Sequence, residues 1–524
     1  MEIKEKHIWY GIFLLILLIS FGINLKVATS TPIIFGDEGY FASRGLWVLE
    51  NLEIPKYWHI YSENTLFNTF DLEIQSIVFL VSSFFAIGGE TLVKMLDPIL
   101  VILTGLMTFL LARKLYSGKV GVLSLFFFLI LPCVITYGIF LYGDMLFTLF
   151  MVSSVYFLVR AVKEDSNKYI ILSGIYGGFA IFTKETGFLI VLIYLVTFLF
   201  YRKNWLKRFL TLLLITSIIV IPWYGLHNYV LLGNPGIPVI ENYFPRSWHS
   251  PDIEILNEET LKLHTTGTYA GIFQYGILNY IQFSYGLGAF MFILMGISYL
   301  LYRKNKDDMM ILLWMFLLIA FVSYYTGGEG KVEALSRWLM PVMPLFAISA
   351  GLSTEKIYNF LKSYGENVGK VIGILFIFMI VIFGLSSANV KAASLEPIKT
   401  WSPAFINGCD WIRRNTPEDS NIVSIWVHHG MYHCKRDVDW VFLPNKDIIV
   451  LDANDTSYDL LKKEGMNYIY FQKFSISFEK TAEVYPVEFV RYIKNSDKFE
   501  KVYEYPENCL YGQGNDCVVV YKIK

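Results

Sequence analysis

Charged side chains are scarce in this chain of 524 residues: they make up 17% of it, whereas hydrophobic residues make up 55%. Soluble globular proteins carry about 25% charged residues, so a set of soluble domains is excluded as the main architecture. No sign of charge is in excess, because 44 lysines and arginines balance 45 aspartates and glutamates. That balance provides no electrostatic footprint for a nucleic acid. Cysteine is also rare, with five residues, which excludes a disulfide-dense scaffold.

The sequence also lacks the local signatures of several common enzyme classes. It contains no Walker phosphate loop, no dinucleotide-binding glycine motif, no Ser-His-Asp nucleophile elbow, no zinc-finger spacing and no internal repeat. What it has in abundance is long apolar runs, with a mean hydropathy of +0.47. The composition therefore indicates an integral membrane protein.

The charge is unevenly distributed and divides the chain in two. From Val390 to Lys524, 36 of 135 residues are charged, as in a soluble domain, whereas the preceding 389 residues contain the other 53. We expect a membrane module at 1–389 and a water-facing α/β domain at 390–524. In the latter the pattern predicts a helix over Phe405–Asn415 and short strands over Ile422–Val427, Ile448–Leu451, Tyr468–Phe471 and Val518–Tyr521.

The apolar runs predict a polytopic α-helical protein with about eleven transmembrane helices, because a helix needs roughly 20 apolar residues to cross the hydrocarbon core. The segment 74–88 is short, and we interpret it as an interfacial or partly inserted helix. A cleaved signal peptide is the alternative interpretation of the first run. The predicted spans lie near 8–25, 96–113, 120–140, 146–160, 169–183, 186–201, 209–223, 277–301, 309–325, 338–353 and 371–389.

The basic residues give an orientation for these spans. If 74–88 does not cross, the segments on the amino-terminal side hold 18 lysines and arginines, and the three short loops on the other side hold three. The positive-inside rule then predicts a cytoplasmic amino terminus and an extracytoplasmic C-terminal domain. Because no eukaryotic retention signal occurs in the sequence, we expect a multi-pass protein of the plasma membrane. The long outer loops would be 26–95 and 224–276.

The most distinctive motif is Phe35-Gly36-Asp37-Glu38-Gly39-Tyr40, which places two adjacent carboxylates at the outer membrane surface. A helical pattern follows it, and this helix could lie on the lipid headgroups. Asp37 could be catalytic, or it could cap this helix. Both interpretations stay open on spacing alone.

Three further outer turns carry single charged groups that the topology places on the same face as Asp37. They are Asp144 in Tyr142-Gly143-Asp144-Met145, Lys184 in Thr183-Lys184-Glu185, and Arg337 in Ser336-Arg337-Trp338. Asp144 could cap a helix and Lys184 could snorkel to the interface. Together, carboxylates beside isolated cations suit a phosphate-bearing, lipid-linked substrate and a divalent ion such as Mg²⁺ or Mn²⁺ held by Asp37 and Asp144.

The C-terminal domain contains the other chemistry-bearing groups. His429 and His433 are four apart, but Gly430 and the strand predicted before it favour a surface loop over a metal-binding helix. Cys133 lies in a predicted span and is expected to be inert. Cys409, Cys434, Cys509 and Cys517 lie outside, and of their three possible pairings we favour Cys409–Cys434 with Cys509–Cys517.

These motifs, in this order and on this side of the membrane, resemble the polytopic C-type glycosyltransferases. The branch containing the dolichyl-phosphate-mannose–protein mannosyltransferases and the aminoarabinose transferases of lipid A is the most similar. The resemblance extends over about 8–350. It rests on the acidic motif, the Asp144 turn, Phe182-Thr183-Lys184-Glu185, Ile221-Pro222-Trp223-Tyr224 leading to Gly233-Asn234-Pro235, and Arg337-Trp338-Leu339-Met340-Pro341-Val342-Met343-Pro344.

The tail segment from Cys409 to Asp419 also resembles stretches of archaeal members and of oligosaccharyltransferase catalytic subunits. The Trp-Trp-Asp-Tyr-Gly signature of the oligosaccharyltransferases is absent, and Ile425-Trp426-Val427-His428-His429-Gly430 stands at the comparable place. This difference argues against transfer of whole oligosaccharides to asparagine.

The resemblance implies an inverting glycosyltransferase that moves a hexosyl or pentosyl group from a polyprenyl (dolichyl) phosphate to a protein or glycan acceptor outside the cytoplasm. Because a polyprenyl phosphate is already a good leaving group, one carboxylate base suffices. By position Asp37 matches that base. Glu38 and Asp144 would orient the acceptor or hold a metal, and Lys184 and Arg337 would neutralise the departing phosphate.

Two other functions compete with this one. A transporter or flippase of a lipid-linked or anionic substrate would place ionisable residues near the middle of the bilayer, whereas here the charges cluster at the ends of the spans. A surface-anchored interaction protein would not need eleven spans. The pattern therefore favours the enzyme.

Overall fold

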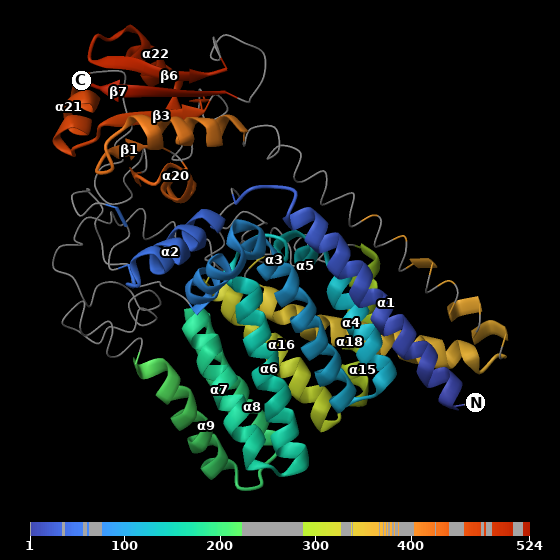
Figure 1. Cartoon of the computed structure of the whole chain (residues 1–524). Helices are drawn as coiled ribbons and strands as arrows, with labels where there is room; N and C mark the ends of the chain where they lie inside the picture. Colours follow the sequence, from blue (N-terminus) through green and yellow to red (C-terminus); the bar gives the residue numbers. More distant parts are fainter. Residues whose placement is uncertain are drawn as a thin grey trace.

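The computed structural model describes most of a helical bundle and a small C-terminal sheet (Figure 1). The description covers 2–33, 37–55, 60–61, 76–222, 287–325, 337, 339–365, parts of 367–386, 403–424, 426–439, 455–472, 476–477, 485–506 and 517–524. The predicted loop 224–276 and the predicted strand Ile448–Leu451 lie outside these residues.

Apolar helices build the bundle, as the sequence predicts. Three of them are long and apolar enough to cross a membrane within the part of the chain described: α1, α3 and α6. The helices are α1 (Glu2–Ala28), α2 (Glu38–Asn51), α3 (Ser76–Leu115), α4 (Gly118–Ile130), α5 (Pro132–Tyr137), α6 (Gly143–Glu164), α7 (Asn167–Thr183), η1 (Glu185–Phe188), α8 (Leu189–Phe200), α9 (Trp205–Val220), α15 (Leu287–Arg303), α16 (Lys306–Tyr325), η4 (Met340–Val342) and α18 (Met343–Lys362).

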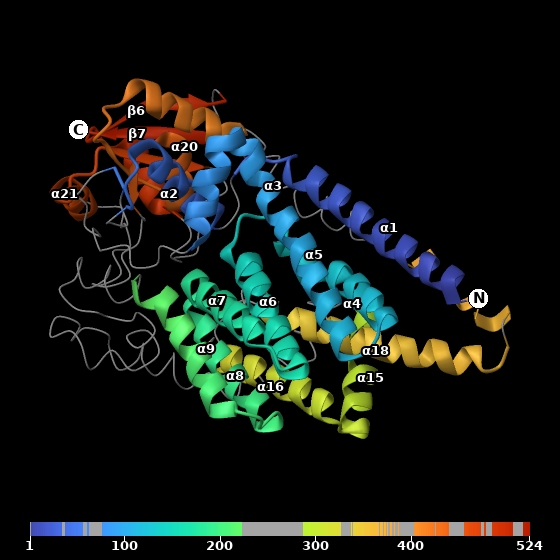
Figure 2. The same ribbon diagram turned by 60° about the horizontal axis from the view of Figure 1, so that its bottom comes forward.

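A glycine pair divides α3 into two arms. Gly88 and Gly89 have non-helical backbone angles, and Gly89 has a φ of 62°, which glycine adopts without steric cost. The first arm contains the segment 74–88 from Ser76 onward and packs against α2, and the second arm contains the predicted span 96–113 (Figure 2). The kink gives a physical basis for treating the two segments separately, and the interfacial position of the first stays a prediction.

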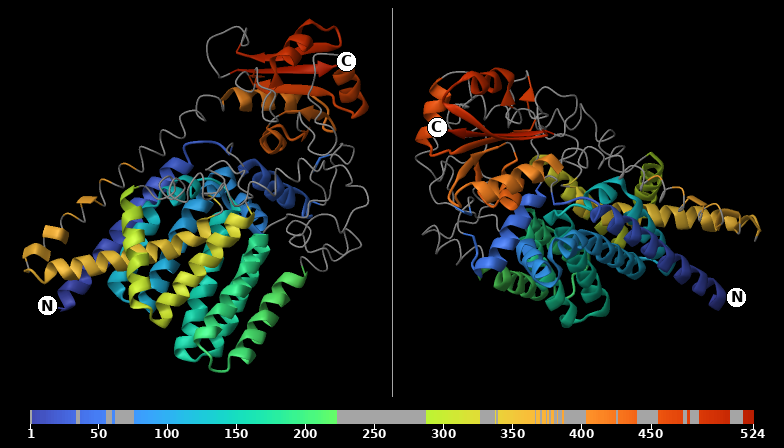
Figure 3. Two further views of the ribbon diagram at one scale, coloured as in Figure 1. Left: turned by 180° about the vertical axis from the view of Figure 1, so that it is seen from behind. Right: turned by 45° about the horizontal axis from the view of Figure 1, so that its top comes forward.

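The connections between helices lie at two ends of the bundle. At one end, ion pairs join the turns after α6, α8 and α15: Lys163 Nζ is 2.6 Å from Asp307 Oδ2, and Lys203 Nζ is 2.6 Å from Asp165 Oδ2. The C-terminal region, which here means 403–524 as far as it is described, lies at the opposite end beside α2 (Figures 1 and 3). In this arrangement the basic turns lie at one end of the bundle and the acidic motif lies at the other end, which agrees with their predicted separation.

A five-stranded mixed sheet organises the C-terminal region, in the order β2-β1-β3-β7-β6. β1 pairs in parallel with β2 and β3, and β7 runs antiparallel to β3 and β6. The elements of the sheet and its surroundings are helix 403–415, β1 (Asn421–Val423), α20 (Val427–Cys434), β2 (Asp437–Asp439), α21 (Asp455–Lys463), β3 (Tyr468–Gln472), β4 (Ile476–Ser477), β5 (Tyr485–Pro486), α22 (Val487–Asn495), β6 (Phe499–Tyr505) and β7 (Val518–Ile523).

The sheet has apolar residues on both faces because helices cover both. Along β3 the side chains alternate: Ile469 and Phe471 pack with Phe489 of α22, whereas Tyr468 and Tyr470 pack on the side that faces the membrane module. Figure 3 shows helix 403–415, in orange, and α22, in red, on opposite sides of the sheet. The predicted helix and the strands at Tyr468 and Val518 are confirmed, whereas the predicted strand Ile422–Val427 ends at Val423.

The cysteines follow the predicted pattern where they are described. Cys409 and Cys434 form a disulfide that ties helix 403–415 to the end of α20, and Cys133 in α5 is buried and forms no disulfide. Cys517 is also disulfide-bonded. Cys509 lies outside the described residues, so the pairing of Cys509 with Cys517 stays a prediction.

Removing the Cys409–Cys434 disulfide should destabilise the C-terminal region by about 3 kcal/mol, because a bridge across a short loop restricts the unfolded chain. We expect Cys434→Ser to lower the midpoint of heat denaturation of the purified protein under oxidising conditions. The matched control is Cys133→Ala, which removes a thiol that closes no loop. Equal midpoints for Cys434→Ser and the wild-type protein would contradict this expectation.

Candidate active site

The acidic motif lies at the start of α2, and its first carboxylate contacts Arg337 and does not cap the helix that follows. Asp37 occupies the N-cap position, but its side chain makes no capping hydrogen bond. Instead, Asp37 Oδ2 lies 2.7 Å from Arg337 Nη1, and the side chain remains 44% exposed. Capping therefore does not account for Asp37, whose side chain is both ion-paired and partly exposed.

Arg337 joins the two acids that the sequence singles out. Its Nη1 contacts Asp37, its Nε lies 3.1 Å from Asp144 Oδ2, and its guanidinium lies 4.6 Å from the centre of the Tyr142 ring. Burial lowers the pKa of Arg337, but Asp144 and Asp37 outweigh that effect, so the pKa stands above its ordinary value. Asp37 and Asp144 thus share one site, held by one permanently charged cation.

Asp144 also binds the second predicted cation. It is the second residue of α6 and is 4% exposed, and its Oδ1 forms an ion pair with Lys184 Nζ. Lys184 stands at the C-cap of α7, and its side chain is 21% exposed. Lys184 therefore pairs with a buried carboxylate and does not simply extend to the membrane interface. Two carboxylates and two cations form a cluster with no net charge, which we call the four-charge cluster: Asp37, Asp144, Lys184 and Arg337.

Buried ionisable side chains support the backbone turn that carries part of this cluster. Glu38 Oε1 accepts hydrogen bonds from Lys94 Nζ at 2.9 Å and from the Leu141 backbone N–H at 3.0 Å. Asp97 Oδ2 accepts from the Tyr142 backbone N–H at 3.1 Å. Glu38, Lys94 and Asp97 are each at most 4% exposed. The structure thus places Glu38 where it supports the turn that carries Tyr142 and Asp144.

Sequence reasoning missed Lys94 and Asp97. Both lie in the apolar helix α3, three residues apart and therefore on one helical face. Ionisable residues in such a helix are costly unless they are paired, so they tend to mark functional interiors. That signal could have pointed to them, although their partners Glu38 and Tyr142 come from distant parts of the chain.

The prediction of a surface loop at His428–His433 is wrong. These residues form the helix α20, and His429 is buried with an exposure of 3%. The reason lies in Gly430: a Cβ there would approach Val438 Cγ2 to 2.7 Å. Gly430 therefore allows close packing against β2 and does not break the helix.

No cluster of three or more histidine, cysteine, aspartate or glutamate side chains that could hold a metal occurs among the described residues. His429 packs edge-on against Trp426, and His433 Nε2 lies 2.6 Å from the Ile33 carbonyl oxygen, so the two imidazoles have different partners. At Asp37 and Asp144, the other candidate ligands, Arg337 contacts both carboxylates.

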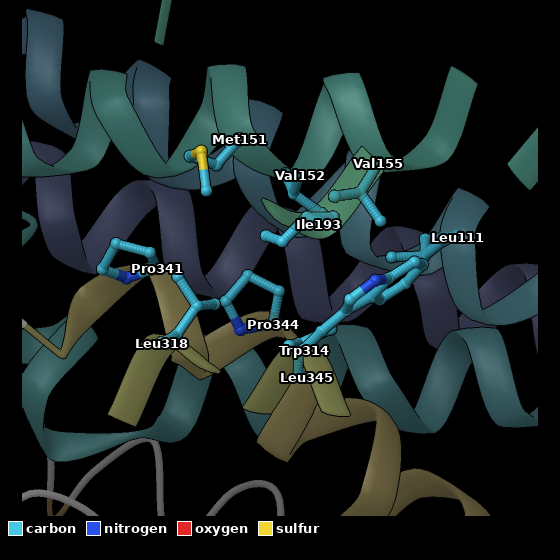
Figure 4. Close-up of a pocket in the computed structure, with 10 residues that line it drawn as sticks. All are labelled: Leu111, Met151, Val152, Val155, Ile193, Trp314, Leu318, Pro341, Pro344 and Leu345. Carbon is cyan, nitrogen blue, oxygen red and sulfur yellow. The ribbon is translucent and has the colours of Figure 1, made fainter. Parts of the chain in front are cut away.

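A small apolar cavity lies inside the bundle (Figure 4). Met151 on α6 lies seven residues beyond Asp144, about 10 Å along the helix. Pro341 follows Arg337 by four residues. The indole N–H of Trp314 has no hydrogen-bond partner among the described residues. The lining residues are Leu111, Met151, Val152, Val155, Ile193, Trp314, Leu318, Pro341, Pro344 and Leu345.

Comparison with known families and structures shows which proteins this chain is similar to in sequence and in fold. The family model described as dolichyl-phosphate-mannose-protein mannosyltransferase matches residues 76–225. No curated protein sequence matches the chain. The matched residues include the second arm of α3, Asp144 and Lys184.

Solved structures of similar fold cover nearly all of the chain. The oligosaccharyltransferase AglB from Archaeoglobus fulgidus, in complex with an inhibitory peptide and a dolichol-phosphate, has a TM-score of 0.66 at 15% identity, over 96% of this chain and 74% of that one. ArnT from Cupriavidus metallidurans, bound to undecaprenyl phosphate, has a TM-score of 0.63 at 11% identity, over 98% of both chains. The mycobacterial arabinofuranosyltransferase AftD has a TM-score of 0.59 at 11% identity, and the match spans 97% of this chain but 40% of AftD.

At these identities the structural matches establish the fold, and the family model adds a sequence match over residues 76–225, from α3 to α9. The predicted resemblance to the C-type glycosyltransferases, on the mannosyltransferase and aminoarabinose transferase side, is confirmed. A polytopic, mostly helical membrane protein with a small sheet is likewise confirmed, while the number of spans stays a prediction.

Proposed function

We propose that this chain, which has the C-type glycosyltransferase fold, transfers a sugar from a polyprenyl-phosphate donor to a protein or glycan acceptor at the outer face of the membrane. One observation carries the proposal: Arg337 contacts both Asp37 and Asp144, at the end of the bundle opposite the basic turns. The site thus combines an accessible carboxylate with two cations, directly above apolar helix surfaces.

In this proposal Asp37 is the base. Its 44% exposure leaves the carboxylate open to an acceptor hydroxyl arriving from outside. Asp37 takes the hydroxyl proton, the acceptor oxygen forms a bond to the anomeric carbon, and the bond from that carbon to the phosphate oxygen breaks. The electron pair leaves with the polyprenyl phosphate, and the single displacement inverts the anomeric centre.

Arg337 and Lys184 stabilise the phosphate that departs. Before the donor binds, Asp37 and Asp144 neutralise both cations, so the cluster is stable without substrate. A donor phosphate would share these cations with the carboxylates, and its charge rises as the bond breaks. The bidentate guanidinium suits a phosphate geometrically. The apolar cavity beyond Asp144 offers a surface for the first isoprene units.

A divalent cation such as Mg²⁺ or Mn²⁺ would have Asp37 and Asp144 as ligands, and a further structure of the archaeal oligosaccharyltransferase contains Zn and sulfate. In this chain the guanidinium of Arg337 contacts both carboxylates, so a metal ion between them would have to displace it. We infer that Arg337 supplies the positive charge that a metal would otherwise bring.

Chelation should therefore leave transfer nearly unchanged. We expect purified protein in excess EDTA to retain its rate within about twofold, because a permanently charged arginine cannot be removed by a chelator. The measurement is the initial rate of sugar transfer before and after EDTA treatment. A large fall in the transfer rate after EDTA treatment, reversed by added Mn²⁺ or Mg²⁺, would show that a metal ion supplies the positive charge at this site.

The proposed function is tested by mass spectrometry of surface glycans from cells with and without this gene. We expect one sugar to disappear from a defined acceptor, and the wild-type gene, but not the Asp37→Asn gene, to restore it. A transporter would instead leave the sugar attached to the lipid and change its distribution across the membrane. Unchanged glycans in both strains would contradict the proposal.

A further inference from the structure

The backbone of Ile33, four residues before Asp37, is held from both sides. Its N–H donates to Glu90 Oε1 at 3.1 Å, and its carbonyl oxygen lies 2.6 Å from His433 Nε2. Since a carbonyl oxygen only accepts, Nε2 must donate. Burial lowers the pKa of His433, which favours a neutral imidazole with its proton on Nε2.

Glu90 is in turn held by the C-terminal region. Its Oε2 accepts a hydrogen bond from the Tyr432 hydroxyl at 3.1 Å, and the Tyr432 ring lies 6.1 Å from the Phe85 ring. Glu90 comes directly after the Gly88–Gly89 kink of α3. A chain of three hydrogen bonds therefore links α20, the kink of α3 and Ile33.

Helix α20 also contacts the residues that follow Asp37 in the acidic motif. A Cβ at Gly39 would lie 2.7 Å from the backbone carbonyl carbon of His428 and 2.7 Å from the His429 nitrogen. The Tyr40 ring packs edge-on against the His428 ring at 5.2 Å. Glycine at position 39 is thus required by the close approach of α20 to α2 (Figure 2).

We propose that Tyr432 and His433 of α20, together with Glu90 of α3, are positioning residues that hold Ile33, four residues before Asp37, and so set the distance of Asp37 from Arg337. We call these three residues the α20 clamp. The inference rests on the proposed function, in which Asp37 is the base. It gives the C-terminal region a direct part in transfer, because α20 contacts the chain on both sides of Asp37.

The first test is Tyr432→Phe, which removes one hydroxyl and keeps the ring. We expect kcat to fall about tenfold, because small displacements of a reacting group cost large factors in rate. The KM for the donor should stay within about twofold, because Lys184 and Arg337 are unchanged. The matched control is Tyr492→Phe, which removes a tyrosine–carboxylate hydrogen bond, to Asp455, in the same region but away from the membrane module.

The second test measures the clamp without any activity. In hydrogen–deuterium exchange, the peptide that contains the Ile33 amide should exchange faster in Tyr432→Phe than in the wild-type protein, and Tyr492→Phe should leave it unchanged. His433→Leu should also speed exchange and lower kcat. His433→Gln should restore both, because the glutamine side chain can still donate to the Ile33 carbonyl.

The outcomes separate the clamp from the proposed function. If the wild-type protein transfers sugar and Asp37→Asn does not, but Tyr432→Phe changes neither kcat nor exchange at Ile33, the clamp is wrong and the function stands. If exchange at Ile33 rises as expected but the wild-type protein transfers no sugar, the clamp contact is real and the function is wrong. If kcat falls equally in Tyr432→Phe and in the Tyr492→Phe control, the effect reflects a general loss of stability, and the clamp is wrong.

Discussion

Asp37→Asn should reduce sugar transfer by about 10²- to 10⁴-fold, the range that a positioned general base contributes. Asparagine has nearly the same shape, and its oxygen can still accept the hydrogen bond from Arg337, so the site should remain assembled. What it loses is the ability to take a proton from the acceptor hydroxyl. The measurement is kcat for transfer with saturating donor, together with the yield of purified protein.

The matched control for this variant is Glu50→Gln. Glu50 lies on the same helix, α2, and is also paired with a cation, Lys435, at 2.7 Å. Because it lies at the far end of α2, its neutralisation should leave kcat nearly unchanged. Transfer by Asp37→Asn at the rate of Glu50→Gln would remove Asp37 as the base.

Arg337→Ala should have the second largest effect, a loss of about 10²- to 10³-fold in kcat/KM, as expected when a preorganised donor to a developing anion is removed. The substitution also leaves Asp37 and the buried Asp144 without their shared cation. Repulsion between the carboxylates and the incoming phosphate should then weaken donor binding. Arg337→Lys should be intermediate, because a single ammonium cannot reproduce the planar fork that contacts both acids.

The measurements for Arg337→Ala are kcat/KM and the dissociation constant for polyprenyl phosphate alone. Arg160→Ala is the matched control, since Arg160 also pairs with a carboxylate, Glu164, but lies at the other end of the bundle. Unchanged affinity for polyprenyl phosphate in Arg337→Ala would place the phosphate elsewhere and contradict the assigned role.

The sequence was sufficient to predict the bundle, the C-terminal sheet region and the shared location of the four-charge cluster. The reason is physical: ionisable residues are costly inside membrane-spanning helices, so the few charges at the ends of the apolar runs stand out in the sequence. Asp37, Asp144, Lys184 and Arg337 come from four separate segments, and the predicted topology places all four at one end of the bundle. Sequence could not show that Arg337 lies between the two acids, because that depends on how α6 and α18 pack.

Two features could not be predicted for a related reason. The position of Glu38 next to Asp37 predicts a second catalytic carboxylate. In the structure, however, Glu38 is buried and accepts hydrogen bonds from Lys94 and from the Leu141 backbone N–H. Gly430 is predicted to break a helix because glycine has a low helix propensity. In the structure it lies within α20, where the absence of a side chain allows β2 to pack closely. In both cases contacts between segments far apart in the chain override the local pattern.

The central claim is that the sugar leaves a polyprenyl phosphate at the site formed by Asp37, Asp144, Lys184 and Arg337. The most direct test incubates purified protein with a polyprenyl-phosphate sugar labelled in the sugar, and with acceptor material from cells that lack the gene. The account predicts that label moves from lipid to acceptor with the wild-type protein, and that Asp37→Asn binds the donor but leaves the label on the lipid. The account would be contradicted if folded wild-type protein left the label on the lipid. It would also be contradicted if Asp37→Asn moved the label from the lipid at the wild-type rate.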